Sequence, residues 1–304
     1  MIALLAPGQG AQTPGMLADW LELPGATEQI TRWSEISGLD LARLGTTATA
    51  EDITDTAVTQ PLVVATTLLA HAELTKRGLP ALAPGKTVVA GHSVGEIAAY
   101  AIAGVICPDD AVKLAAVRGS EMAKACAVEP TGMSAVLGGD EAEVLARLEA
   151  LELVPANRNA AGQIVAAGSV TALEKLAEDP PAKARVRQLA TAGAFHTHYM
   201  ASAMDGYATA AAEIAVNDPI TTLLSNVDGQ PVTSGQDAMD KLVAQMTRPV
   251  RWDLCNQTMG KLGITAIVEF PPAGTLTGIA KRELRGVATR AVKTPADLDG
   301  LAEF

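Results

Sequence analysis

The stretch Thr87-Val88-Val89-Ala90-Gly91-His92-Ser93-Val94-Gly95-Glu96 decides the fold of this 304-residue chain. It places the pattern Gly-x-Ser-x-Gly between an apolar run typical of a buried strand and a second apolar run, residues 96–104, typical of a helix. A serine on a sharp turn between strand and helix needs glycines on both sides, because any side chain there would clash across the turn. The stretch therefore predicts an α/β fold with Ser93 on a nucleophile elbow.

A serine in this position suits acyl transfer. The helix expected to start at Val94 would offer unpaired backbone N–H groups beside the hydroxyl, and such groups stabilise a developing oxyanion. The bare pattern also occurs in ordinary glycine-rich turns. The strand before it and the helix after it are what favour the nucleophile over the plain turn.

Composition indicates a large α/β protein and argues against several other classes. A chain of this length exceeds one average domain, so we expect two lobes. Hydrophobic residues make up 48% but aromatic residues only 3%, which suits helices packed on a parallel sheet. A net charge of −11 argues against nucleic acid as a partner. No apolar run has membrane-spanning length and no basic leader starts the chain, so we expect a cytoplasmic protein that does not bind membranes.

The three cysteines argue against a disulfide framework and against a zinc site. They are odd in number and far apart, and no C-x-x-C pair occurs. We expect Cys107, Cys126 and Cys255 to be buried thiols in a reducing compartment, and we expect no metal centre.

One part of the chain has its own order of expected elements. Strands are predicted at residues 133–137, 153–157, 164–167 and 184–189, with helices at 141–151 and 171–178. This is β-α-β-β-α-β, the ferredoxin-like order. We therefore predict a small ferredoxin-like subdomain at residues 128–192, inserted into a large hydrolase-like subdomain formed by residues 1–127 and 193–304.

The large subdomain is expected to contain a parallel central sheet covered by helices. Apolar runs predict strands at residues 2–6, 222–225 and 266–270, and helical spacing predicts helices at 61–77, 108–124 and 200–214. The glycine-rich segment at residues 7–12 predicts a loop whose backbone approaches a ligand closely.

A serine nucleophile needs a base within hydrogen-bond reach, and histidine is the usual one. Of the four histidines, His92 lies inside the elbow and should point elsewhere, and His71 lies in an apolar helical run. His196 and His198 remain. His196 is favoured because it lies downstream of the serine in a short loop after Gly193, as hydrolase-like chain order requires.

Two further groups stay open at this point. No acid stands out to orient the histidine, and a backbone or amide carbonyl can hold an imidazole tautomer in its place. Arg118 lies at the edge of the apolar stripe of its helix. It is either a half-buried cation that awaits a substrate carboxylate, or an exposed arginine paired with Glu121 or solvent.

The sequence resembles the malonyl-CoA:acyl carrier protein transacylases, the acyltransferase family of bacterial type II fatty acid synthases. This family has a hydrolase-like large subdomain with a ferredoxin-like insert, which agrees with the order of elements above. The resemblance spans nearly the whole chain and rests on motifs in this order: Gly8-Gln9-Gly10-Ala11-Gln12, Gln60-Pro61, Gly91-His92-Ser93-Val94-Gly95-Glu96, Arg118-Gly119, Asn157-x-Asn159 with Gly162-Gln163, His196, and Pro249-Val250-Arg251-Trp252.

The resemblance implies a role for each reacting group. Ser93 would be the nucleophile and His196 the base, and the backbone N–H groups of Gln9 and Val94 would form the oxyanion hole. In this family a main-chain carbonyl orients the histidine, and we expect that carbonyl near residues 249–251.

The resemblance also implies the substrate contacts. Arg118 would pair with the free carboxylate of the malonyl group, and Gln60, Asn157 and Asn159 would line the site. Phe195 resembles the malonyl-selecting form of related acyltransferase domains.

The implied reaction is a ping-pong transfer. A malonyl group would pass from malonyl-CoA to Ser93 and then to the phosphopantetheine thiol of acyl carrier protein, which would supply fatty acid elongation or a polyketide-like pathway. No cofactor is implied, because malonyl-CoA is a substrate.

Two competing functions remain. A serine esterase or thioesterase shares the elbow and the histidine, but it would use an acid to orient that histidine and would not need Arg118. A carrier-binding module without catalysis would form no acyl-Ser93.

Overall fold

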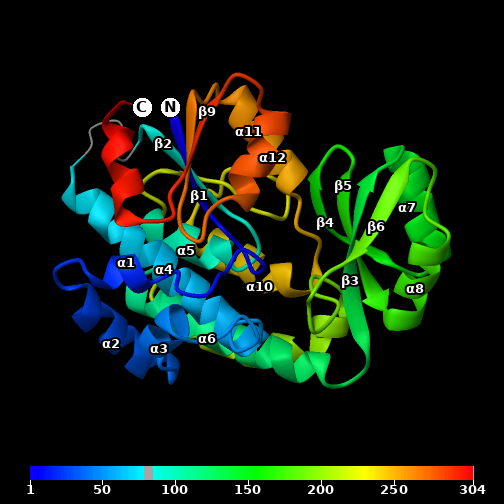
Figure 1. Cartoon of the computed structure of the whole chain (residues 1–304), viewed down its shortest axis with the longest axis horizontal. Helices are drawn as coiled ribbons and strands as arrows, with labels where there is room; N and C mark the ends of the chain where they lie inside the picture. Colours follow the sequence, from blue (N-terminus) through cyan, green and yellow to red (C-terminus); the bar gives the residue numbers. More distant parts are fainter. Residues whose placement is uncertain (79–84, 304) are drawn as a thin grey trace.

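The computed structural model describes residues 1–78 and 85–303, in which the strands form two separate sheets (Figure 1). The larger sheet has five strands in the order β7-β2-β1-β8-β9, and every neighbouring pair is parallel. This confirms the predicted α/β fold with a parallel central sheet. Its strands are β1 (Ile2–Ala6), β2 (Thr87–Gly91), β7 (Thr222–Leu223), β8 (Ala266–Glu269) and β9 (Ala288–Ala291).

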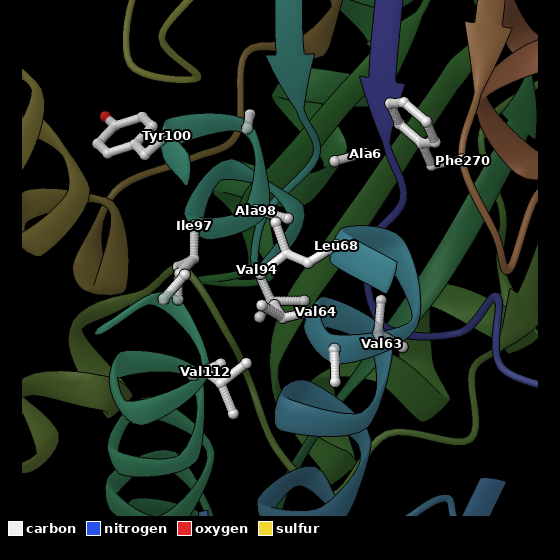
Figure 2. Packing of buried hydrophobic residues seen from close by; sticks show 14 of the residues in the cluster. Ala6, Val63, Val64, Leu68, Val94, Ile97, Ala98, Tyr100, Val112 and Phe270 are labelled. Carbon is white, nitrogen blue, oxygen red and sulfur yellow. The ribbon is translucent and has the colours of Figure 1, made fainter. Parts of the chain in front are cut away.

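Both faces of the large sheet are buried under helices. Along β1, Leu4 and Ala6 pack into one apolar core, whereas Ala3 and Leu5 pack into another. Because successive strand residues point to opposite faces, the two cores lie on opposite sides of the sheet. Figure 2 shows the first core, where α4 (Thr56–Lys76), α5 (Gly95–Ile102) and α6 (Pro108–Cys126) meet. The second core contains residues of α11 (Trp252–Lys261) and α12 (Thr275–Glu283).

Helix α4 begins earlier than the sequence predicts. The helical spacing of apolar residues predicts a start at residue 61. Instead the carboxylate of Asp55 accepts a hydrogen bond from the backbone N–H of Ala57 at 2.8 Å, so the helix starts at Thr56 and Pro61 lies inside it. The added turn matters for function because it includes Gln60.

Helices α4 and α6 pack closely where Gly119 faces the start of α4. A Cβ atom at Gly119 would lie 2.7 Å from the carbonyl oxygen of Thr56, so only glycine allows this approach. The close packing places Gln60 of α4 beside Arg118 of α6.

The second sheet is antiparallel and has the order β4-β5-β3-β6. Its strands are β3 (Thr131–Gly138), β4 (Val154–Ala160), β5 (Gln163–Ser169) and β6 (Ala184–Gln188), and its helices are α7 (Glu141–Ala150) and α8 (Val170–Glu178). The predicted β-α-β-β-α-β order is confirmed. We call residues 131–188 the small lobe, drawn in green in Figure 1, and the remaining elements the large lobe.

Backbone hydrogen bonds join the two lobes. The N–H of Val250 donates to the carbonyl of Ala156 at 2.8 Å, and the N–H of Arg158 donates to the carbonyl of Val250 at 2.9 Å. The segment before α11 therefore pairs with β4 of the small lobe.

The other helices complete the large lobe. None of the helices in residues 1–78 and 85–303 is long and apolar enough to cross a membrane. They are α1 (Ala18–Leu21), α2 (Ala26–Ser37), α3 (Leu41–Thr46), η2 (His198–Ala203), α9 (Met204–Ala212), α10 (Gly235–Ala244), η3 (Gln245–Thr247) and η4 (Pro295–Glu303).

Candidate active site

Ser93 lies on the turn between β2 and α5, as predicted. Its φ of 55° is in the left-handed region, which is strained for a residue with a side chain. A Cβ atom at Gly91 would lie 2.0 Å from the carbonyl oxygen of Gly95, and one at Gly95 would lie 2.3 Å from that of Ala6. The two glycines are therefore required by the turn, and the elbow is confirmed.

His196 faces the serine from the loop that follows the small lobe. Its Nε2 atom lies 2.7 Å from Ser93 Oγ, and its Nδ1 atom lies 2.8 Å from the carbonyl oxygen of Gln245. Burial, together with the nearby Arg118 cation, lowers the pKa of His196 to about 3. The imidazole is thus neutral at physiological pH. With Nδ1–H donating to Gln245, its Nε2 lone pair points to the hydroxyl of Ser93.

The group that orients the histidine is not where the sequence placed it. We expected a carbonyl near residues 249–251, but the carbonyl that accepts from His196 belongs to Gln245 at the start of η3. The Val250 carbonyl instead accepts from the backbone N–H of Arg158 in β4. The expected segment is occupied in joining the lobes.

Two backbone donors lie beside the serine. Gln9 belongs to the loop after β1, and Val94 is the N-cap of α5. A Cβ atom at Gly8 would lie 2.7 Å from the carbonyl oxygen of His92, so this loop lies against the elbow. Within the part of the chain that the structure describes, neither the Gln9 nor the Val94 backbone N–H donates a hydrogen bond. Both are available to a ligand oxygen.

Arg118 is buried in the site, and only 1% of its surface is exposed. Its Nη1 donates to Oε1 of Gln60 and its Nη2 to Oε1 of Gln245, each at 2.8 Å, and Nη2 lies 3.5 Å from Ser93 Oγ. Burial lowers the pKa of this guanidinium. No carboxylate in the described ranges forms an ion pair with Arg118. Glu121 pairs with Lys124 instead, so the alternative of an exposed arginine is excluded.

A cavity of about 400 Å³ lies between the two lobes at this point. The predicted site residues all line it except Val94, which is buried. Those that line it are Gln9, Gln60, Ser93, Arg118, Asn157, Asn159, Phe195 and His196. Further walls come from Met133, Ala135, Gln163 and Val165 of the small lobe and from Thr275, Leu276 and Ile279 of α12.

The small lobe contributes three polar side chains to the cavity, those of Asn157, Asn159 and Gln163. Asn159 accepts a hydrogen bond at 2.8 Å from Nε2 of His92, whose ring packs edge-on against Trp252. Burial lowers the pKa of His92, so this ring is neutral. His92 thus points away from the Ser93–His196 pair, as predicted, and it holds the wall residue Asn159. Asn157 lies next to it in β4, where it forms a bridge with Val250.

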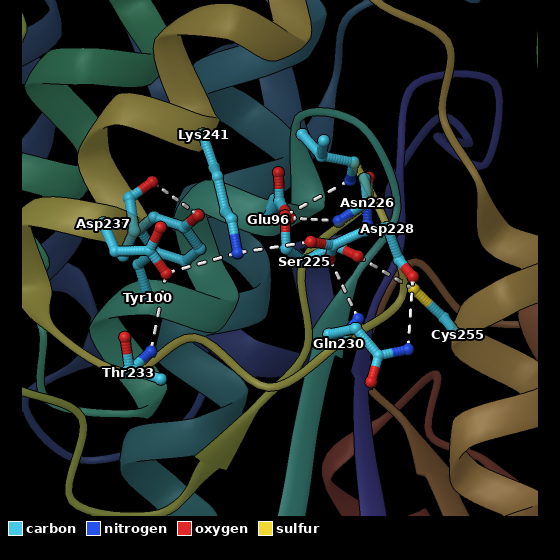
Figure 3. A network of polar contacts seen from close by, with 12 residues as sticks. Glu96, Tyr100, Ser225, Asn226, Asp228, Gln230, Thr233, Asp237, Lys241 and Cys255 are labelled. Atoms are coloured by element: carbon cyan, nitrogen blue, oxygen red, sulfur yellow. Dashed lines mark hydrogen bonds and ion pairs between the residues drawn. The ribbon is translucent and has the colours of Figure 1, made fainter.

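Sequence reasoning missed three buried polar residues behind the reacting groups. Asn226 accepts at 2.8 Å from the backbone N–H of Ser93 and donates at 2.7 Å to the carbonyl of Gly91, so it braces the elbow. Gln245 contacts both His196 and Arg118. Glu96 accepts hydrogen bonds from the backbone N–H of Asn226, as Figure 3 shows, and from the side chain of Gln245. The available signal was Glu96 itself, an acid in an otherwise apolar helical run, since a buried acid requires partners.

Comparisons with known proteins show that the chain is similar to acyltransferases. A family model described as acyl transferase domain matches residues 4–296. The malonyl CoA-acyl carrier protein transacylase of Mycobacterium tuberculosis is 74% identical over 304 residues, with all of both chains covered. The protein of the same name from Escherichia coli is 33% identical over 309 residues and covers 99% of each chain.

Solved structures show the same fold. The crystal structure of MCAT from Mycobacterium tuberculosis superposes with a TM-score of 0.96 at 74% identity, covering 99% of both chains. A complex described as a type II PKS acyl-carrier protein with its malonyl-transacylase gives a TM-score of 0.93 at 29% identity, again with 99% of both chains covered.

Proposed function

This chain belongs to the acyl transferase domain family and to the malonyl CoA-acyl carrier protein transacylases, and on that premise we propose that it moves a malonyl group from malonyl-CoA to an acyl carrier protein. The observation that carries the proposal is one cavity that holds both a serine–histidine pair and a buried arginine without a carboxylate partner among the described residues. The serine–histidine pair forms the acyl ester. The buried arginine selects an acyl group that carries its own carboxylate.

In the first half-reaction Ser93 acts as the nucleophile and His196 as the base. His196 Nε2 takes the hydroxyl proton while Oγ attacks the thioester carbonyl, and the tetrahedral intermediate then breaks its C–S bond. The proton on His196 passes to the leaving coenzyme A thiolate. The carbonyl of Gln245 keeps the imidazole in the tautomer that this step needs.

The oxyanion of the intermediate would be bound by the backbone N–H groups of Gln9 and Val94. Free donors that are already in place stabilise the developing charge without reorganisation, and removal of one such donor typically costs about 10²-fold to 10³-fold in rate.

Arg118 would bind the malonyl carboxylate. Its Nη2 is within 3.5 Å of Ser93 Oγ, so an acyl group on the serine reaches it with a carboxylate at the far end. Gln60 and Gln245 hold the guanidinium from both sides, so it is oriented before the substrate arrives. A charge-assisted pair in a buried site favours malonyl over acetyl.

In the second half-reaction His196 removes the proton of the carrier thiol, whose sulfur attacks the carbonyl of the malonyl-serine ester. The C–O bond to Ser93 then breaks, and His196 returns the proton to Ser93 Oγ. Asn157, Asn159 and Phe195 would line the path of the acyl group and its carrier arm. The reaction as proposed needs no cofactor. We also propose that the chain divides into a large subdomain of residues 1–127 and 193–304 and a small subdomain of 128–192, since β3 to β6 all lie within the latter.

The test is intact-protein mass spectrometry after mixing with malonyl-CoA in the absence of carrier. We expect a malonyl adduct on the wild-type protein that is absent from Ser93→Ala and is discharged when holo-carrier is added. Acetyl-CoA should give no acetyl adduct in the time that malonyl-CoA needs to modify the protein. Rapid release of free malonate without an adduct would identify a thioesterase instead. An unmodified protein with intact malonyl-CoA would identify a carrier-binding module without catalysis.

A further inference from the structure

Glu96 is a fully buried carboxylate that the malonyl transfer described above does not use. It lies in the first turn of α5, three residues after the nucleophile, with none of its surface exposed. Its Oε1 accepts from the backbone N–H of Asn226 at 2.6 Å, and its Oε2 accepts from Nε2 of Gln245 at 2.5 Å. Figure 3 shows Glu96 pointing to Asn226 from α5. Both oxygens thus act as acceptors.

Gln245 connects this carboxylate to both His196 and Arg118. Its backbone carbonyl accepts from His196 Nδ1 at 2.8 Å, and its side-chain Oε1 accepts from Arg118 Nη2 at 2.8 Å. A guanidinium can only donate and a carboxylate can only accept. The amide of Gln245 therefore has one satisfied orientation, with its NH₂ toward Glu96 and its oxygen toward Arg118.

We propose that Glu96 is a positioning residue whose carboxylate holds the Gln245 amide in the one orientation that keeps His196 and Arg118 aligned for malonyl transfer. The inference rests on the function proposed above and adds a residue to it. Glu96 does not touch the substrate. It acts through Gln245, so its loss disturbs the base and the malonyl-binding cation together.

Removing the negative charge changes the hydrogen-bond pattern. A protonated carboxyl group, or the amide of Glu96→Gln, offers one oxygen acceptor and one donor where two acceptors are needed. The donor then faces an N–H of Asn226 or of Gln245. If the Gln245 amide turns to relieve that contact, it presents its NH₂ to the Arg118 guanidinium, and two donors face each other.

The same reasoning predicts that activity depends on pH, because Glu96 is the group in this network that changes charge near neutral pH. Burial raises the pKa of Glu96 to about 7, against the opposing effect of the bonds from Asn226 and Gln245 and of the Arg118 charge. Below that value the proton on Glu96 removes one acceptor. The His196 pKa of about 3 means that protonation of the base does not explain a loss of activity near neutral pH.

Four other groups around Glu96 keep their charge state in this range. Burial raises the pKa values of Tyr100, Tyr207 and Cys255, which stay neutral, and Arg118 stays a cation. Asp228 lies nearby on the loop after β7, and its carboxylate pairs with Lys241 at 3.4 Å.

The experiment measures the single-turnover rate of Ser93 malonylation between about pH 5 and pH 8. For the wild type we expect the rate to fall below a midpoint of about 7. For Glu96→Gln we expect a rate about 10²-fold lower at the upper end of this range, the effect of displacing reacting groups by about 1 Å. We also expect that variant to lose the fall near neutral pH and to lose preference for malonyl over acetyl.

The matched control is Glu269→Gln. Glu269 is equally buried, but its carboxylate accepts from the backbone N–H groups of Gly274, Leu276 and Thr277 and contacts neither Gln245 nor Arg118. This variant should unfold at a lower temperature and still keep the wild-type pH midpoint. A purely structural role of Glu96 would make the two variants behave alike.

A Glu96→Gln rate within about threefold of the wild type, or an unchanged pH midpoint in that variant, would overturn the inference. If Glu96→Gln does not fold, infrared titration of the wild-type protein decides. A carboxylic acid C=O band that disappears around pH 7 supports the inference, and its absence refutes it. Failure of the wild type to form malonyl-Ser93 would instead refute the proposed function.

Discussion

The two lobes contain the same kind of backbone strain but use it differently. In the large lobe Ser93 and His196 have φ values of 55° and 61°, and their side chains face each other at 2.7 Å. In the small lobe Glu152 and Lys183 have φ values of 56° and 60°, but both are exposed turn residues. A left-handed φ therefore does not mark an active site by itself. It does so where the surrounding packing holds a polar side chain in a buried position.

The packing of the two sheets explains this division. Strands β1 and β2 are buried along their whole length between two apolar cores, whereas β6 at the edge of the small sheet is mostly exposed. A sheet that is packed tightly on both faces can keep the backbone of a turn at its end in a strained conformation. The small lobe instead supplies cavity walls, including Asn157 and Asn159.

The largest expected effect comes from adding one methyl group to a glycine in each lobe. Gly95→Ala should abolish malonylation of Ser93 and lower the free energy of unfolding by about 3 kcal/mol or more, because the new Cβ would lie 2.3 Å from the carbonyl oxygen of Ala6. Gly132→Ala in β3 should cost less than about 1 kcal/mol, since its Cβ would meet only Leu173 at 3.4 Å. Urea unfolding and intact mass measure both. Equal losses of unfolding free energy in the two variants would contradict the difference between the lobes.

The next effect compares two arginines. Arg118→Ala should slow malonyl transfer by about 10²-fold and leave the slow acetyl reaction nearly unchanged, because a buried charge-assisted bond contributes about 1.5 to 3 kcal/mol. Arg158→Ala in β4 removes a cation that pairs with Glu141 on the small lobe. It should change neither rate by more than about twofold. Competition between malonyl-CoA and acetyl-CoA gives the ratio directly, and an Arg118→Ala enzyme that still prefers malonyl would reject the assigned role.

The smallest effect concerns the free energy of unfolding at acid pH. All four histidines lie in the large lobe, so their titration affects that lobe. Burial lowers the pKa of His71, packed against Phe270, from 6.5 to about 4. A depressed histidine pKa means that its stability contribution is present above pH 6.5 and is lost as the pH falls toward 4. His71→Leu should therefore lose less stability than the wild type over that interval, by about 1 to 2 kcal/mol, because the partly exposed ring keeps some of its hydration.

The control for this titration is His198→Leu, at an exposed histidine. It corrects for the loss of an exposed imidazole. If His71→Leu follows the wild-type pH curve of the unfolding free energy, the acid sensitivity has another origin.

The sequence predicted the features that depend on local patterns. The glycines of the elbow and the alternating elements of the small lobe were recognisable because each is encoded within a short segment. His196 was chosen from chain order and its loop position. The exposure of Arg118 remained open, because it depends on the close contact of α4 and α6 at Gly119, two segments distant in sequence.

The parts that were missed depend on the backbone or on long-range packing. Every residue has a carbonyl, so nothing in the residue type of Gln245 marks its carbonyl as the one that orients His196. Asn226 directly follows the strand predicted at residues 222–225, and Glu96 begins the helical run predicted at residues 96–104. Only the folded chain brings the three together, across separations of 19 to 149 residues.

The backbone pairing of Val250 with β4 has a consequence for engineering. The small lobe is connected to the rest of the protein by its two chain ends. Two backbone hydrogen bonds that Val250 forms with Ala156 and Arg158 are an additional connection. A homologous lobe transplanted between those chain ends would need a free carbonyl and a free N–H at the positions in β4 that correspond to Ala156 and Arg158, so that both can bond to Val250. Chimeras with altered acyl selectivity should therefore exchange the segment around Val250 together with the lobe.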